Sequence, residues 1–280
     1  MNKIYRETDI QILIATMNRT NLDFLRIMFG NCEVESLSIL IVNQTSPEKL
    51  LKSDFDNIKI INSFEVGLSK SRNLSLEKAS KDIVVICDDD VVYKHDFISM
   101  ILFSFNNYKS SIHCFQTETD EGILYSNYPK KIKKLNYRSI RKVLSIEVSF
   151  LRKEIKSKNC FYNELFGLGA KFEDSETFFF LRNCMYKSVD VVFFPFTIVE
   201  HKSFSSSDDI NSDRLLYAKM GGFCKVYGYL SYFFLIKFIF FLVRKKKILF
   251  KSFFYKFKVG SKGIIDYKMI LKNNLDKKYE

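Results

Sequence analysis

The chain has 280 residues, 47% of them hydrophobic, which is enough to bury a full core and excludes an intrinsically disordered protein. Its formal net charge of +12 is uneven, because no acidic residue occurs between Asp213 and Asp266. The six cysteines are scattered without a CxxC pair, and no secretory signal is apparent. We therefore expect free thiols in a reducing cytosol, and no zinc site.

Short apolar runs alternate with amphipathic stretches along the first part of the chain. This alternation predicts an α/β fold with a mostly parallel central sheet and right-handed crossovers. In such sheets, ligands bind beyond the carboxyl ends of the strands. The expected strands are 10–15, 37–42, 58–61, 83–87, 112–117, 148–153 and 189–194, and the expected helices include 20–29, 68–79, 93–107 and 178–185.

A buried strand at 83–87 runs directly into Asp88, Asp89 and Asp90. Because side chains alternate across a strand, Asp88 and Asp90 are expected on one side, with Asp89 opposite or in the following loop. Two hard oxygen ligands on one side suit Mg²⁺ or Mn²⁺. Taken alone, the three aspartates would equally fit an ordinary acidic loop at a strand end.

The segment before that strand reads GLSKSRN and opens on a turn at Gly67, with Ser69 as a helix cap. Arg72 and Asn73 lie at the start of the following helix, within reach of the same strand end. A divalent ion, a guanidinium and helix-start amides together predict a site for a diphosphate.

The whole stretch 67–90 resembles the inverting family 2 glycosyltransferases of the GT-A fold, of the kind that builds bacterial surface polysaccharides. Their nucleotide-binding half reads Gly-Leu-Ser/Ala-x-Ala/Ser-Arg-Asn, then a helix, then a strand ending in Asp-x-Asp. The resemblance extends over residues 8–205. It implies a nucleotide-sugar donor held by residues that include Gly67, Ser69, Arg72, Asn73, Asp88 and Asp89, with a metal held by Asp88 and Asp90.

The same resemblance assigns the ends of the first two strands to the donor. Thr16, Asn18 and Arg19 match the family's Thr-x-Asn-Arg, which lines the base pocket. The second strand usually ends in a carboxylate that holds the base and ribose. Asn43 and Gln44 stand there in this chain, so an amide is expected to keep that contact.

A general base is also implied by the resemblance. In the family, Phe-Gly-x-Gly precedes a Glu-Asp pair at a helix start, and residues 166–169 match the first part. Counting back from Pro195, expected just after a strand, places Glu176 on the glutamate and Thr177 on the aspartate. Either Glu176 is the base, or the loop shifts and Asp174 is; both acids could instead be simple helix caps.

Two further features follow the next strand. His201 occupies a place where this fold often has a histidine that binds the metal or the diphosphate, although a lone histidine is commonly structural. Residues 203–209 are predicted to form a loop that closes over the donor.

The last part of the chain mixes aromatic and basic residues. Residues 226–243 contain one charge, Lys237, and Arg244–Lys247 follow at once. Eighteen residues is the lower limit for a membrane span, and the basic flank also suits a helix lying on anionic lipid. We expect monotopic attachment; a true span and a buried packing helix stay open. The aromatic residues favour a membrane over nucleic acid as the partner.

These inferences predict a GT-A glycosyltransferase domain at 1–215 and a membrane-associating segment at 216–280. The expected reaction is inverting transfer from a nucleotide diphosphate sugar, UDP-sugar favoured, to a hydroxyl of a glycan or lipid-linked acceptor, with Mg²⁺ or Mn²⁺. The expected location is the inner, cytoplasmic face of the cell membrane. Two alternatives remain: a sugar nucleotidyltransferase, although a Gly-rich basic loop after the first strand is lacking, and a non-catalytic binding protein without its base.

Overall fold

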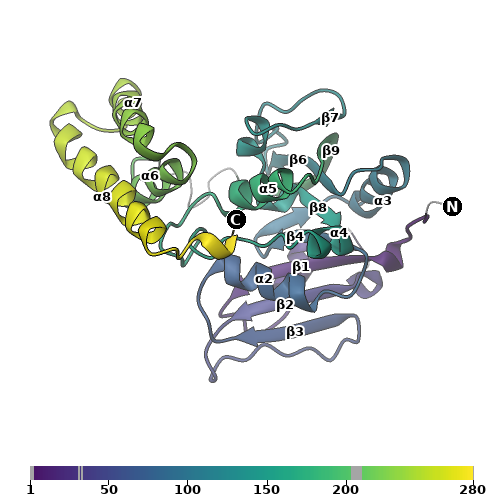
Figure 1. Cartoon of the computed structure of the whole chain (residues 1–280). Helices are drawn as coiled ribbons and strands as arrows, with labels where there is room; N and C mark the ends of the chain where they lie inside the picture. The colour runs from purple at the N-terminus through teal and green to yellow at the C-terminus, as the bar shows by residue number, and fades with distance from the viewer. Residues whose placement is uncertain (1–2, 31, 33, 203–209, 280) are drawn as a thin grey trace. The chain divides into compact units, whose positions relative to one another are not determined.

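The computed structural model describes residues 3–30, 32, 34–202 and 210–279, and the chain forms two compact units (Figure 1). The sheet unit comprises Met1–Val66, Lys70–Tyr162 and Thr177–Ser203. The helical unit comprises Gly67–Ser69, Asn163–Glu176 and Phe204–Glu280. The predicted division at residue 215 would place 163–176 with the first domain, whereas the structure groups this segment with the C-terminal helices.

The sheet unit is built on a sheet with the strand order β3-β2-β1-β4-β8-β6-β9-β5, and β7 pairs with β9 (Figure 1). From β3 to β4 all neighbours are parallel, and β8 then runs antiparallel to both β4 and β6. The mixed α/β fold with a mostly parallel sheet is therefore confirmed. The strands are β1 Ile10–Met17, β2 Ile39–Gln44, β3 Ile58–Ser63, β4 Ile83–Asp88, β5 Val91–Tyr93, β6 Ile112–Thr119, β7 Lys133–Lys134, β8 Val148–Leu151 and β9 Val191–His201.

Helices cover both faces of this sheet, which explains why its central strands are mostly apolar on both sides. One face packs Ile12, Ile14 and Val85 against α1 and α3, and the other packs Leu13 and Val84 against α2, α4 and α5. The helices are α1 Asp23–Met28, α2 Leu68–Lys78, α3 Phe97–Asn107, α4 Arg152–Ser157 and α5 Glu176–Tyr186. The 3-10 turns are η1 Glu7–Asp9, η2 Val34–Ser36, η3 Ser139–Lys142, η4 Ser145–Glu147, η5 Gly228–Leu230, η6 Phe250–Ser252 and η7 Lys277–Tyr279.

The last long strand differs from its prediction. It was expected to end at residue 194, before Pro195, but β9 continues through the proline to His201. Cys114 of β6 pairs with Phe193, whereas Gln116 pairs with Thr197, so the register shifts around Pro195. An irregularity there accommodates a residue that has no N–H to donate.

In the helical unit, α6 (Asp213–Tyr227), α7 (Ser231–Arg244) and α8 (Phe253–Lys272) follow one another. The helix expected at 226–243 is interrupted, because α6 ends at Gly228 with a positive φ of 57° and a 3-10 turn precedes α7. The backbones of α6 and α8 approach closely at Gly263, where an added Cβ would lie 2.2 Å from the Tyr217 carbonyl oxygen. Phe172, in the loop at 163–176, stacks on Tyr217.

Candidate active site

The carboxyl ends of β1, β2 and β4 meet at one edge of the sheet. The parallel register aligns Ala15 with Asp88 and Thr16 with Asn43. The residues just beyond these positions therefore converge, as the sequence predicts for a ligand site.

Asp88, the last residue of β4, is held by two donors. Its Oδ1 accepts a hydrogen bond from Arg72 Nη2 at 2.7 Å, and its Oδ2 accepts one from Ser145 Oγ at 3.0 Å. Arg72 is 1% exposed, and its guanidinium lies 5.5 Å from the centre of the Tyr162 ring. The ion pair is therefore largely withdrawn from solvent on the arginine side, which makes it a fixed part of the site.

Asp89 binds the end of β1 and the segment that follows it. Its Oδ2 accepts from Arg19 Nε at 2.7 Å and from Thr16 Oγ1. The Arg19 guanidinium also lies 4.9 Å from the Phe24 ring, and 41% of the Arg19 side chain is exposed. Arg19 thus exposes its charge to solvent, while Asp89 and the Phe24 ring fix the orientation of its guanidinium.

Asn43 positions the backbone of Arg19. The side chain is fully buried; its Oδ1 accepts from Arg19 N at 3.1 Å and its Nδ2 donates to Arg19 O at 3.0 Å. Asn18, just before, has a left-handed φ of 55°, and its N–H donates to the Gln44 carbonyl. Gln44 is itself buried at 6% exposure.

Asp90 and His201 form a third pair at this edge. His201 Nε2 lies 3.7 Å from Asp90 Oδ2, and β5 and β9 are paired where His201 stands opposite Val91. This contact is the main reason why the pKa of Asp90 is lowered and that of His201 is raised. His201 Nδ1 lies 2.9 Å from the Lys202 carbonyl, which can only accept, so Nδ1 carries a proton and Nε2 faces the carboxylate.

This pair fits one side of a divalent-cation site. A carboxylate that is 64% exposed and an imidazole nitrogen 3.7 Å apart can both bind Mg²⁺ or Mn²⁺, which commonly complete their shells with water and phosphate oxygens. Among the described residues, no group of three or more His, Cys, Asp or Glu side chains is gathered for a metal. Asp88, expected to be a second aspartate ligand, has both oxygens engaged by Arg72 and Ser145.

The GLSKSRN segment is tied down by its own polar side chains. Within the sheet unit, the Asn73 amide accepts from Tyr162 N at 2.8 Å and donates to Tyr162 O at 2.9 Å. Within the helical unit, Ser69 Oγ donates to the Phe166 carbonyl at 2.6 Å, and Gly67 has a φ of 135°. Ser69 and Asn73 thus hold neighbouring backbone in place; the donor contacts expected of them stay a prediction.

The candidate bases lie in the helical unit. Glu176 is the first residue of α5 and packs so closely on Gly167 that a Cβ there would lie 3.2 Å from its side chain. Asp174 accepts from Ser175 Oγ at 3.0 Å and pairs with Lys219 at 3.3 Å. The glycine of the Phe-Gly-x-Gly motif, whose φ is 100°, is therefore what allows Glu176 its position.

Two residues of the site went unrecognised in the sequence. Ser145, which binds Asp88, belongs to η4, and Glu147 closes the same turn at 1% exposure. Glu147 accepts from Tyr128 Oη, from Thr117 Oγ1 at 3.1 Å and from Leu144 N at 3.0 Å. Burial raises its pKa to about 8. An acid placed directly before the apolar run 148–151 was the signal that could have revealed it.

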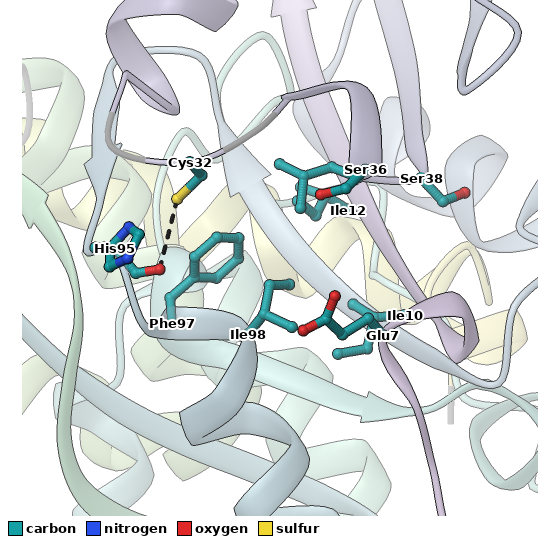
Figure 2. A pocket seen from close by; sticks show the side chains of 10 residues that line it. Glu7, Ile10, Ile12, Cys32, Ser36, Ser38, His95, Phe97 and Ile98 are labelled. Atoms are coloured by element: carbon teal, nitrogen blue, oxygen red, sulfur yellow. Dashed lines mark hydrogen bonds between the residues drawn. The ribbon is translucent and has the colours of Figure 1, made fainter.

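Other features lie apart from this edge. A cavity of about 170 Å³, lined by residues that include Ile10, Cys32 and His95, sits at the amino ends of β1 and β2 (Figure 2). There Cys32 Sγ donates to the His95 carbonyl at 3.8 Å. None of the predicted donor or metal residues lines this cavity. The loop predicted to close over the donor, 203–209, lies outside the described residues.

Comparison with known proteins gives a family match and a set of similar folds. The family model described as "Glycosyl transferase family 2" matches residues 12–165. A crystal structure of S. aureus TarS has a TM-score of 0.51 at 14% identity, covering 75% of this chain and 39% of that one. Residues 1–349 of TarS in complex with UDP have a TM-score of 0.52 at 12% identity, covering 95% and 91%. At such identities the likeness shows the fold alone, and no match was found among curated proteins.

Proposed function

Since the chain belongs to glycosyl transferase family 2 and is a glycosyltransferase, we propose that it transfers a sugar, with inversion, from a nucleoside diphosphate sugar to a hydroxyl acceptor. The observation that carries this proposal is the turn at Asp88–Asp90. Its three carboxylates each bind a different basic side chain, namely Arg72, Arg19 and His201. These charged groups are gathered beyond the strand ends, where a charged donor would bind.

The donor is a UDP-sugar in this proposal. Arg19, fixed by Asp89 and by the Phe24 ring, offers an oriented guanidinium with exposed surface for the nucleotide. Thr16 shares the same aspartate and keeps the first strand end in register with it. The similar fold of TarS, for which a complex with UDP exists, supports uridine as the base.

A divalent cation would be held by Asp90 and His201, the pair whose donor atoms face each other. When bound, it would neutralise the charge that develops on the leaving diphosphate. Arg72 belongs to the same charge arrangement through Asp88. The two arginines would keep the aspartates oriented whether or not the cation is present.

The acceptor hydroxyl must lose a proton as the new glycosidic bond forms, and an inverting enzyme uses one carboxylate for this. We assign that role to Glu176, from its place in the motif and at the first residue of α5. Asp174 is the second candidate, although Lys219 and Ser175 already engage its Oδ2.

For the acceptor we propose a glycan carried on a lipid, with the protein on the cytoplasmic face of the membrane. The support is the run of aromatic and basic residues after 226, which sets the protein beside such an acceptor. A nucleotidyltransferase and a non-catalytic binding protein are both disfavoured by membership of a glycosyltransferase family.

The test is release of UDP from a panel of UDP-sugars, measured with Mn²⁺ and a mixture of glycan acceptors. Wild type should turn over at least one donor. Glu176→Gln should bind UDP as wild type does while its turnover falls by about 100-fold or more. Normal turnover in Glu176→Gln together with loss in Asp174→Asn would move the base to Asp174. No turnover of any UDP-sugar of the panel by wild type would count against the proposed function.

A further inference from the structure

Helix α7 has two apolar faces, and the described part of the chain covers one of them. Ser231, Leu235, Ile239 and Leu242 are buried, at the spacing of one helical face. On the opposite side, the exposed apolar residues also fall at helical spacing; they are Phe233, Ile236, Phe240 and Phe241. A helix that is apolar on all sides is normally buried by protein or membrane on all sides. The second face is therefore expected to bind a partner.

This exposed face continues across the turn into α8. The Phe240 ring lies 5.4 Å from that of Phe253, which in turn contacts Phe250 at 6.0 Å and Phe254 at 5.7 Å. Phe254 is 82% exposed and Phe250 is 65% exposed. We define the aromatic surface as Phe233, Ile236, Phe240, Leu249, Phe250 and Phe254. Its extent over α7, η6 and the start of α8 exceeds what scattered surface hydrophobics produce.

The charged residues of the segment 233–254, which carries the aromatic surface, are all basic. Lys237 lies within it, the exposed run Arg244–Lys247 follows the end of α7, and Lys251 is exposed beside Phe250. No acidic residue occurs from 214 to 265. A partner must therefore combine an apolar layer with negative charge at its boundary, which is the chemistry of an anionic bilayer.

The break in the helix before α7 bears on whether the segment would span such a bilayer or lie on its surface. By length and composition, the stretch Asp213–Arg244 could cross a membrane, with 22% of its most apolar window buried. The helix is interrupted at Gly228, however, and α7 has 14 residues. At about 1.5 Å per residue α7 is roughly 21 Å long, against about 30 Å for the hydrocarbon core. A straight helix of this length is too short to cross the hydrocarbon core, and it suits a position in the interface.

We propose that the aromatic surface inserts into the headgroup boundary of an anionic membrane, with α7 lying in the plane and its lysines bound to lipid phosphates. Lys237 extends its charged end out of the apolar face, as long basic side chains do at interfaces. The surface belongs wholly to the helical unit; the inference rests on the membrane location given in the proposed function, but not on the donor chemistry.

The charged rim and the apolar centre make separable contributions. Each basic residue near an anionic surface is worth about 1 kcal/mol, or about fivefold in binding. Replacing Lys245, Lys246 and Lys247 by glutamine should therefore weaken binding to anionic vesicles on the order of 100-fold. Replacing Phe250 and Phe254 by serine removes buried apolar area and should weaken binding at least tenfold.

The experiment is vesicle flotation of the full chain with phosphatidylcholine alone and with 30% phosphatidylglycerol. Wild type should float with the anionic vesicles only, and both variants should lose that binding while still releasing UDP from the donor. Phe64→Ser, an equally exposed aromatic of the sheet unit, is the matched control and should float as wild type does.

Three outcomes would overturn the proposal. Flotation that is equal on both vesicle types would remove the role of the lysines. Unchanged flotation of the Phe250/Phe254 variant would remove the role of the aromatic surface. Failure of wild type to bind either vesicle, with dimers in sedimentation that Phe254→Ser abolishes, would assign the surface to a second copy of the chain.

Discussion

Glu147 offers a test of the buried turn that carries Ser145 to Asp88. Its carboxyl is 1% exposed and accepts hydrogen bonds from two hydroxyl groups and one backbone N–H. Burial raises its pKa from 4.5 to about 8. Between these values the folded protein retains a proton that the unfolded chain releases, so stability falls as pH rises.

The size of this effect follows from the two pKa values. At about 1.4 kcal/mol per pH unit, the contribution of Glu147 to the free energy of unfolding should fall by about 3.5 kcal/mol between pH 5 and pH 8. Glu147→Gln cannot titrate and lacks this dependence. Wild type should therefore lose stability relative to the variant as pH rises.

Urea unfolding of wild type and Glu147→Gln at pH 5, 6, 7 and 8 measures this directly. Glu121→Gln, which alters an exposed glutamate in a turn, is the control for general titration and should follow the wild-type curve. Parallel pH curves for wild type and Glu147→Gln would refute the reasoning, because Glu147 would then titrate alike in both states.

Three other changes probe the packing and the site. Gly263→Ala should lower the free energy of unfolding by about 3 kcal/mol, measured by urea, since its Cβ would lie 2.2 Å from the Tyr217 carbonyl oxygen. Arg72→Met should lower the free energy of unfolding by about 2–3 kcal/mol, a figure reduced because Asp88 is partly exposed. It should also weaken nucleotide binding, measured by calorimetry. Asn43→Asp, although it restores a carboxylate usual in the family, should lose about 1–3 kcal/mol in the same unfolding assay, because two acceptor oxygens face that side chain.

The first two changes have neighbouring controls, and the third has a contradicting result of its own. Lys262→Ala, exposed on α8, should leave stability within about 0.5 kcal/mol, and equal effects at 262 and 263 would contradict the close helix packing. Lys70→Met breaks an exposed pair on the helix of Arg72 and should matter little. Tighter nucleotide binding by Asn43→Asp would show that position 43 contacts the donor.

Much of the fold was predictable because the sheet strands are continuous apolar runs. The strand at 83–87 and its neighbours were recognised within a few residues, since burial on both faces leaves a strong signal. The course of β9 through Pro195 was not recognised, because it depends on pairing with β6 at a shifted register. The break at Gly228 was also missed, since the apolar composition continues across it.

In the site, motif spacing predicted several residues that the structure gathers at the strand ends, but not the partner of each. The three aspartates were expected to divide between two sides of a strand; instead each binds a basic group from a different element. Asn43 and Asn73 matched donor-site positions, yet their amides hold backbone segments remote in sequence. Such pairings depend on tertiary contacts that no local pattern records.

The most direct test of the account is calorimetric titration of the protein with UDP, GDP, ADP and CDP, with and without Mn²⁺. We expect one nucleotide, UDP, to bind more tightly with Mn²⁺, and Asp89→Asn and Asp90→Asn each to weaken that binding by at least tenfold. Lys70→Met should bind as wild type does. Absence of binding by all four nucleotides, or unchanged affinity in both aspartate variants, would contradict the assignment of this strand edge as the donor site.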